Sequence, residues 1–205
     1  MNLKYKAVVQ ILSDCFDILE DQVIAFRGRL QHLQRLGFPP GVNTGRGKPS
    51  KYGWSELVLL RVAFEYLDMG GTPDRAAAEL TKHKEELLEA VCSVVNSVYL
   101  TSEHRNSRHF LKLELSALDS LKAGQSSGCG LGILSLQQVE ALFAPEPGDI
   151  VEAHYAFVDL DKVITSLVDQ VHKVSGADDP DTVTSIVEWS QSVDSKDILQ
   201  MQATA

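Results

Sequence analysis

The chain has 205 residues, of which 44% are hydrophobic and 23% charged, as in an ordinary soluble globular protein of one or two domains. No apolar run approaches the roughly 20 residues that span a bilayer, and the N-terminus lacks a cleavage site, so we expect neither a membrane helix nor a signal peptide. Cys15, Cys92 and Cys129 form no paired motif, which favours a reducing cytoplasm over a disulfide framework.

The net charge of −9 is divided unevenly along the chain. Residues 1–61 hold nine Lys/Arg against five Asp/Glu, a balance of +4, and the remaining residues hold ten against twenty-three, a balance of −13. A basic front ahead of an acidic remainder suggests that the front contacts a polyanion. Chance variation among solvated side chains is the alternative.

The first part of the chain has a strong helical signal. Residues 5–12 could form a short helix or a strand, but from Ile18 to Leu36 apolar residues recur at spacings of three to five, which predicts an amphipathic helix. Gly37, followed by two prolines, predicts where that helix ends.

Two further helices are predicted after a loop. Ser55 is expected to cap the first, with Trp54 and Leu59 placed as a hydrophobic staple, and Gly70-Gly71 to end it. Thr72-Pro73 predicts the start of a long helix over 73–100. Its apolar residues alternate steps of three and four, so this seam could pack on its own domain or on a partner helix.

The second half has a mixed pattern. Alternating leucines over 109–118 predict a half-buried strand, and 154–160 a second one. Helices are expected at 135–143, 161–174 and 182–189, a glycine-rich loop at 124–132 and a frayed tail at 193–205. The predicted fold is therefore mainly α with an α+β C-terminal part. The chain is expected to divide into an N-terminal helical domain over 1–72, a linking and dimerisation helix over 73–100, and a small α+β domain over 101–192.

The loop after the first long helix, "RLGFPPGVNTGRGKPSKYGWSEL" (35–57), is basic and rich in glycine and proline. The helix before it can enter the major groove of DNA, where Arg, Gln and His can reach base edges. The Gly-Arg-Gly-Lys-Pro tip can bring cations against phosphates, and its proline limits the entropy lost on docking.

Residues 16–85 resemble the winged helix-turn-helix of MerR-type transcriptional regulators. "RLQHLQRLGFPP" stands at the helix end, "GRGKPSKY" at the wing and "WSELVLLRVAFEYLDMGGTPDRAAAEL" at the following two helices. The resemblance implies that the DNA-contacting residues lie on the helix and the wing. They would be Arg27, Arg29, His32, Arg35, Arg46, Lys48, Lys51 and Tyr52.

Signals for catalysis are weak in this sequence. There is no phosphate-binding loop motif and no zinc-protease motif, and His104 and His109 have no cysteine near them in sequence. Asp159 and Asp161 could be a catalytic carboxylate pair, but a helix cap is the more ordinary explanation. We therefore expect no enzymatic activity, no cofactor and no metal.

The predicted function is a cytoplasmic, sequence-specific DNA-binding transcriptional regulator that acts as a homodimer on double-stranded DNA. A protein partner or a small effector would bind the C-terminal domain. The alternative is an adaptor protein, such as a phage- or plasmid-type accessory factor, that keeps a winged-helix fold without reading DNA. A contiguous basic surface from Arg27 to Lys51 would favour DNA, and a mixed or apolar one a protein partner.

Overall fold

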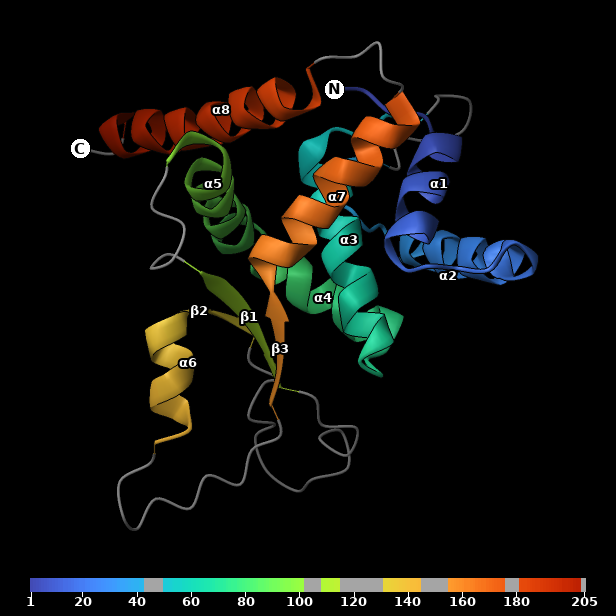
Figure 1. Cartoon of the computed structure of the whole chain (residues 1–205), viewed down its shortest axis with the longest axis horizontal. Coiled ribbons are helices and arrows are strands. Elements are labelled where there is room, and N and C mark those ends of the chain that lie inside the picture. Colours follow the sequence, from blue (N-terminus) through green and yellow to red (C-terminus); the bar gives the residue numbers. More distant parts are fainter. Residues whose placement is uncertain (43–49, 102–107, 115–130, 145–154, 176–180, 204–205) are drawn as a thin grey trace.

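The computed structural model describes residues 1–42, 50–101, 108–114, 131–144, 155–175 and 181–203. Within these ranges the chain is mainly helical, and its second half contributes a small three-stranded antiparallel sheet (Figure 1). This confirms the predicted fold class, mainly α with an α+β C-terminal part. No helix in the described ranges is long and apolar enough to cross a membrane.

The first helix is longer than the segment 5–12 named from the sequence, and the second is shorter than the predicted 18–36. Helix α1 covers Tyr5–Cys15, which decides between helix and strand for this segment, and α2 covers Val23–Arg35. The stretch 18–22 is a turn that includes the short 3-10 helix η1 (Glu20–Gln22). Helix α2 lies across one end of α1 and projects from the edge of the molecule (Figure 1).

Helix α3 (Trp54–Asp68) begins earlier than predicted, and the predicted cap at Ser55 is wrong. Gly53 is the N-cap residue, and its N–H donates to the carboxylate of Glu56 at 2.8 Å. The staple positions on either side of the cap therefore belong to Tyr52 and Leu57, which are both fully buried, instead of Trp54 and Leu59.

The helix predicted over 73–100 is two helices. Helix α4 (Pro73–Lys82) begins as expected, with the Thr72 hydroxyl accepting the N–H of Arg75 at 3.4 Å. The chain leaves helical geometry at His83, and α5 (Lys84–Leu100) follows. The apolar seam packs inside this chain, because α5 lies against α7 and α8.

The sheet is built from three short strands in the order β2-β1-β3. Strand β1 (His109–Glu114) lies between β2 (Leu131–Ser135) and β3 (Tyr155–Asp159), and Leu111 pairs with Ile133 on one side and Val158 on the other. The predicted strands are confirmed over His109–Glu114 and Tyr155–Asp159, while Leu160 already belongs to a helix and 115–118 and 154 lie outside the described residues. Strand β2 was not predicted, and it includes two residues of the loop expected at 124–132. Ser135 ends β2 and caps helix α6 (Leu136–Leu142).

Helix α7 (Leu160–Ser175) joins the two halves of the molecule. It packs against α1, α3 and α5 as well as against the sheet, and its predicted inward residues Val163, Leu167 and Val171 are buried. One hydrophobic core extends from Val8 to Ile186, so the described residues before 72 and after 101 share a core. Helix α8 (Thr182–Ala203) covers α5 and continues through most of the tail that was expected to fray.

Candidate nucleic-acid interface

Helix α2 is amphipathic, and its apolar side fixes which residues face outward. Phe26, Leu30 and Leu33 follow one stripe and are buried in the core. The spacing of four and then three residues is the period of one helical face. The residues between them lie on the other sides of the helix, and all except the half-buried His32 are exposed.

The outward side of α2 carries cations and no acid. Arg27, Arg29 and Arg35 are exposed and His32 is half-buried, while the sequence of the helix, VIAFRGRLQHLQR, has no Asp or Glu. None of the three arginines forms an ion pair with a described residue. Their charges are therefore available to a ligand. The positive charge near the C-terminal end also suits the helix dipole.

The end of α2 directs the chain into the basic loop as predicted. Gly37 has φ +80°, and its N–H donates to the carbonyl of Gln34 at 3.0 Å, while the N–H of Phe38 donates to the carbonyl of Leu33 at 3.0 Å. This pair of bonds is a Schellman motif, which requires the left-handed conformation that glycine adopts at low cost.

The returning arm of the loop is anchored beside α2. Tyr52 exchanges backbone hydrogen bonds with Leu3, at 2.9 and 3.2 Å, and its hydroxyl is hydrogen-bonded to the side-chain amide of Gln34. Burial raises the pKa of Tyr52, so its phenol stays neutral. Lys51, next to it, is exposed.

The predicted contact residues thus separate into three groups. Arg27, Arg29 and Arg35 are exposed on α2, where His32 is half-buried, and Lys51 is exposed on the returning arm of the loop. Tyr52 was predicted to contact DNA, but its side chain is 0% exposed, so it supports the loop from within the core. Arg46 and Lys48, at the predicted wing tip, lie outside the described residues.

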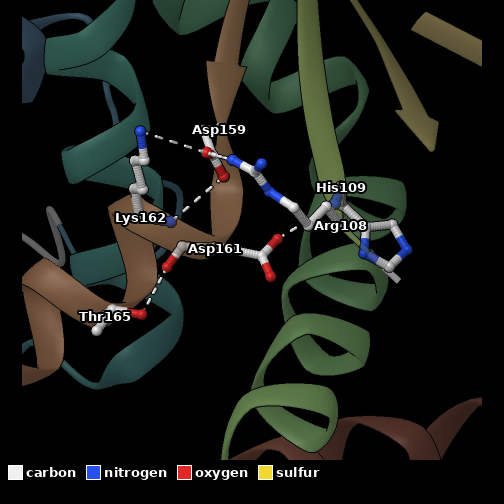
Figure 2. A network of polar contacts seen from close by, with 6 residues as sticks. All are labelled: Arg108, His109, Asp159, Asp161, Lys162 and Thr165. Carbon is white, nitrogen blue, oxygen red and sulfur yellow. Dashed lines mark hydrogen bonds and ion pairs between the residues drawn. The ribbon is translucent and has the colours of Figure 1, made fainter. Parts of the chain in front are cut away.

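A second polar group, which the sequence did not predict, lies where β1 and α7 begin (Figure 2). Arg108 forms an ion pair with Asp159, and the ammonium of Lys162 lies 3.9 Å from the same carboxylate. Asp161 accepts the backbone N–H of His109 at 3.2 Å. Arg108, Lys162 and the two aspartates border a shallow hollow of about 410 Å³.

The two aspartates have structural partners in this group. Asp159 accepts the N–H of Lys162 at 3.4 Å, which makes it the N-cap of α7, as the sequence favoured. Arg108 was missed because it is 51 residues away in the chain and only the sheet brings it to Asp159. Since both carboxylates tie β1 to α7, the arrangement does not resemble a free acid–base pair.

The described cysteines and histidines do not form a metal centre. Cys92 is buried, and burial raises the pKa of the Cys15 thiol, an effect that the nearby positive charge of Arg61 partly offsets. In the ranges that the structure covers, no group of three or more His, Cys, Asp or Glu could hold a metal ion. Cys129 and His104 lie outside those ranges.

Comparison of the chain with protein-family models, with curated proteins and with solved structures found no match. The resemblance to MerR-type regulators therefore stays a prediction that depends on the residues quoted for it.

Proposed function

We propose that this protein is a transcriptional regulator that binds double-stranded DNA through the exposed side of α2 and the basic loop that follows it. The observation that carries the proposal is the set of three exposed arginines on a helix without a single acid. Each can donate to phosphate oxygens or, in bidentate fashion, to the edge of a guanine.

The shape of this region also supports the proposal. Helix α2 projects from the edge of the molecule, with its apolar side on the core and its other side free (Figure 1). A helix presented in this way fits the major groove, which is about 12 Å wide. The remainder of the chain, with its balance of −13, would be repelled by DNA and would restrict contact to the basic front.

Homodimer formation is part of the proposal, because two copies of a reading helix match the two-fold symmetry of paired half-sites. Since the seam of α5 packs within the chain, the dimer contact would use another surface.

An adaptor function is the second candidate, and the apolar residues beside the arginines favour it. Ile24 is 80% exposed at the start of α2, and Leu19 is 70% exposed in the preceding turn. Exposed apolar residues beside arginines are also found on surfaces that bind other proteins.

The proposal is tested by titrating fluorescently labelled genomic double-stranded DNA fragments at physiological salt and following anisotropy. The double variant Arg27→Ala, Arg29→Ala is compared with Lys173→Ala, which removes an exposed cation from α7. We expect the double variant to bind at least about tenfold more weakly and the control to bind as the wild type does. Equal affinities for all three proteins would favour the adaptor function.

A further inference from the structure

A hollow of about 340 Å³ lies where the end of α1, the first half of α2 and the last half of α3 meet. Its volume is within the roughly 300–1,000 Å³ that small-molecule sites have. Three phenylalanines, Phe16, Phe26 and Phe64, form its apolar wall, and Arg29 and Asp68 are its charged lining residues.

The aromatic wall is held in place by contacts among its three rings and with Arg61. The rings of Phe26 and Phe64 are stacked with their centroids 4.4 Å apart, and the ring of Phe16 lies 5.9 Å from that of Phe64. The guanidinium of Arg61, which is nearly buried, lies 4.1 Å from the centroid of Phe16 and is paired with Glu65 at 2.5 Å. A wall that is already ordered reduces the entropy lost when a ligand binds.

The two charged lining residues are of opposite sign. Neither Arg29 nor Asp68 forms an ion pair or a hydrogen bond with a described residue, and they are not paired with each other. Asp68 is the last residue of α3, where the helix dipole adds to the attraction for a cation. The hollow can therefore satisfy one anionic and one cationic group of the same ligand.

We propose that this hollow binds a small zwitterion with an aromatic side chain, the chemistry of an aromatic amino acid. The ring would pack against Phe16 and Phe64, the carboxylate would pair with Arg29, and the ammonium with Asp68. The consequence for DNA rests on the proposed function: a carboxylate on Arg29 neutralises one of the three exposed arginines of α2 and so weakens DNA binding.

The test is isothermal titration calorimetry of the full chain, without DNA, against three probes. L-phenylalanine carries both charges, 3-phenylpropionate lacks the ammonium, and 2-phenylethylamine lacks the carboxylate. We expect L-phenylalanine to bind most tightly and the loss of either group to weaken binding by about tenfold or more.

Variants assign each charge to its partner. In Arg29→Ala, L-phenylalanine should bind no better than 2-phenylethylamine does, and in Asp68→Asn no better than 3-phenylpropionate does. Arg27→Ala is the matched control, because Arg27 lies on the same helix but does not line the hollow, and its affinity for L-phenylalanine should equal that of the wild type. Equal affinities for the three probes, no binding at millimolar concentration, or an unaffected Arg29→Ala would each overturn the inference.

The inference and the proposed function fail separately. If DNA binds and L-phenylalanine does not, the ligand site is refuted and the DNA-binding function stands. If L-phenylalanine binds with the expected dependence on Arg29 and Asp68 but DNA does not bind, the site stands and the DNA-binding function is refuted.

Discussion

Gly71 lies against the ring of Tyr66 so closely that no larger residue fits. A Cβ built on Gly71 would lie 2.0 Å from Cδ1 of Tyr66 and 2.7 Å from its backbone oxygen. Because Tyr66 is buried, its ring has little room to move. We expect Gly71→Ala to lower the free energy of unfolding by about 1–3 kcal/mol, the usual cost of overpacking.

Gly28→Ala is the matched control for this prediction. Gly28 is inside α2, and a Cβ there would have no atom within 4 Å. Alanine should therefore raise the free energy of unfolding by about 0.5–1 kcal/mol, through helix propensity alone. Urea denaturation of both variants measures the two effects, and a stable Gly71→Ala protein would contradict the described contact.

The raised pKa of Tyr99 predicts that the protein loses stability at high pH. Burial, together with the negative charge of Asp169, raises the pKa of Tyr99 to about 12, above the value of 10.0 for a free tyrosine. The folded state therefore keeps the phenol proton more tightly than the unfolded state does. The stability from this group is fully present below pH 10 and is lost as the pH rises toward 12.

The measurement is urea denaturation between pH 9 and pH 12 for the wild type and Tyr99→Phe. The wild type should lose more stability over this range than the variant, which has no proton to release. Parallel curves for the two proteins would show that Tyr99 titrates normally in the folded state.

Residue-scale features with local causes were predictable from the sequence. The stop at Gly37, the cap at Thr72 and the cap at Asp159 each depend on hydrogen bonds within five residues. Tyr52 and Arg108 were not placed correctly, because the burial of Tyr52 depends on Leu3 and the partner of Arg108 is in another strand. A sequence pattern contains no record of such distant partners.

At the scale of elements, two reciprocal hydrogen bonds fasten α8 to the start of α3. The indole N–H of Trp54 donates to the hydroxyl of Ser185 at 3.1 Å, and that of Trp189 donates to the hydroxyl of Ser55 at 2.9 Å. Both serines and Trp189 are partly exposed, so water competes for these groups. Each bond should contribute about 0.5–1.5 kcal/mol.

A double-mutant cycle on the second bond tests this attachment. Trp189→Phe and Ser55→Ala each remove the same hydrogen bond, so the double variant should be less destabilised than the sum of the two by about 1 kcal/mol. Thermal unfolding of the four proteins supplies the values. Strict additivity would mean that the indole and the hydroxyl do not interact.

Element boundaries were predicted less well than element types. The break at His83 was missed because the apolar period continues across it, with Leu80 and Leu87 both buried. Strand β2 was missed because its first residues, Leu131 and Gly132, continue the glycine-rich stretch that was predicted to be a loop, and its pairing with β1 is what identifies it. For β2 the deciding contacts come from β1, a separate element of the chain.

At the scale of the whole molecule, α7 connects the two halves of the chain. It follows β3 in the second half of the chain, yet it packs against α1 and α3 of the first half (Figure 1). The hydrophobic pattern of α7 predicted which side is buried but could not say against what. The basic helix α2 is therefore mounted on a core to which both halves contribute.

We propose that α2 contacts the phosphates and the bases of DNA. The most direct test is the dependence of DNA affinity on salt concentration for the wild type, the double variant Arg27→Ala, Arg29→Ala, and the control Lys173→Ala. Each phosphate contact contributes about 0.9 to the slope of log affinity against log salt. We expect the double variant to lose about two units of slope and the control to lose none. Identical slopes for the double variant and the wild type would contradict this proposal.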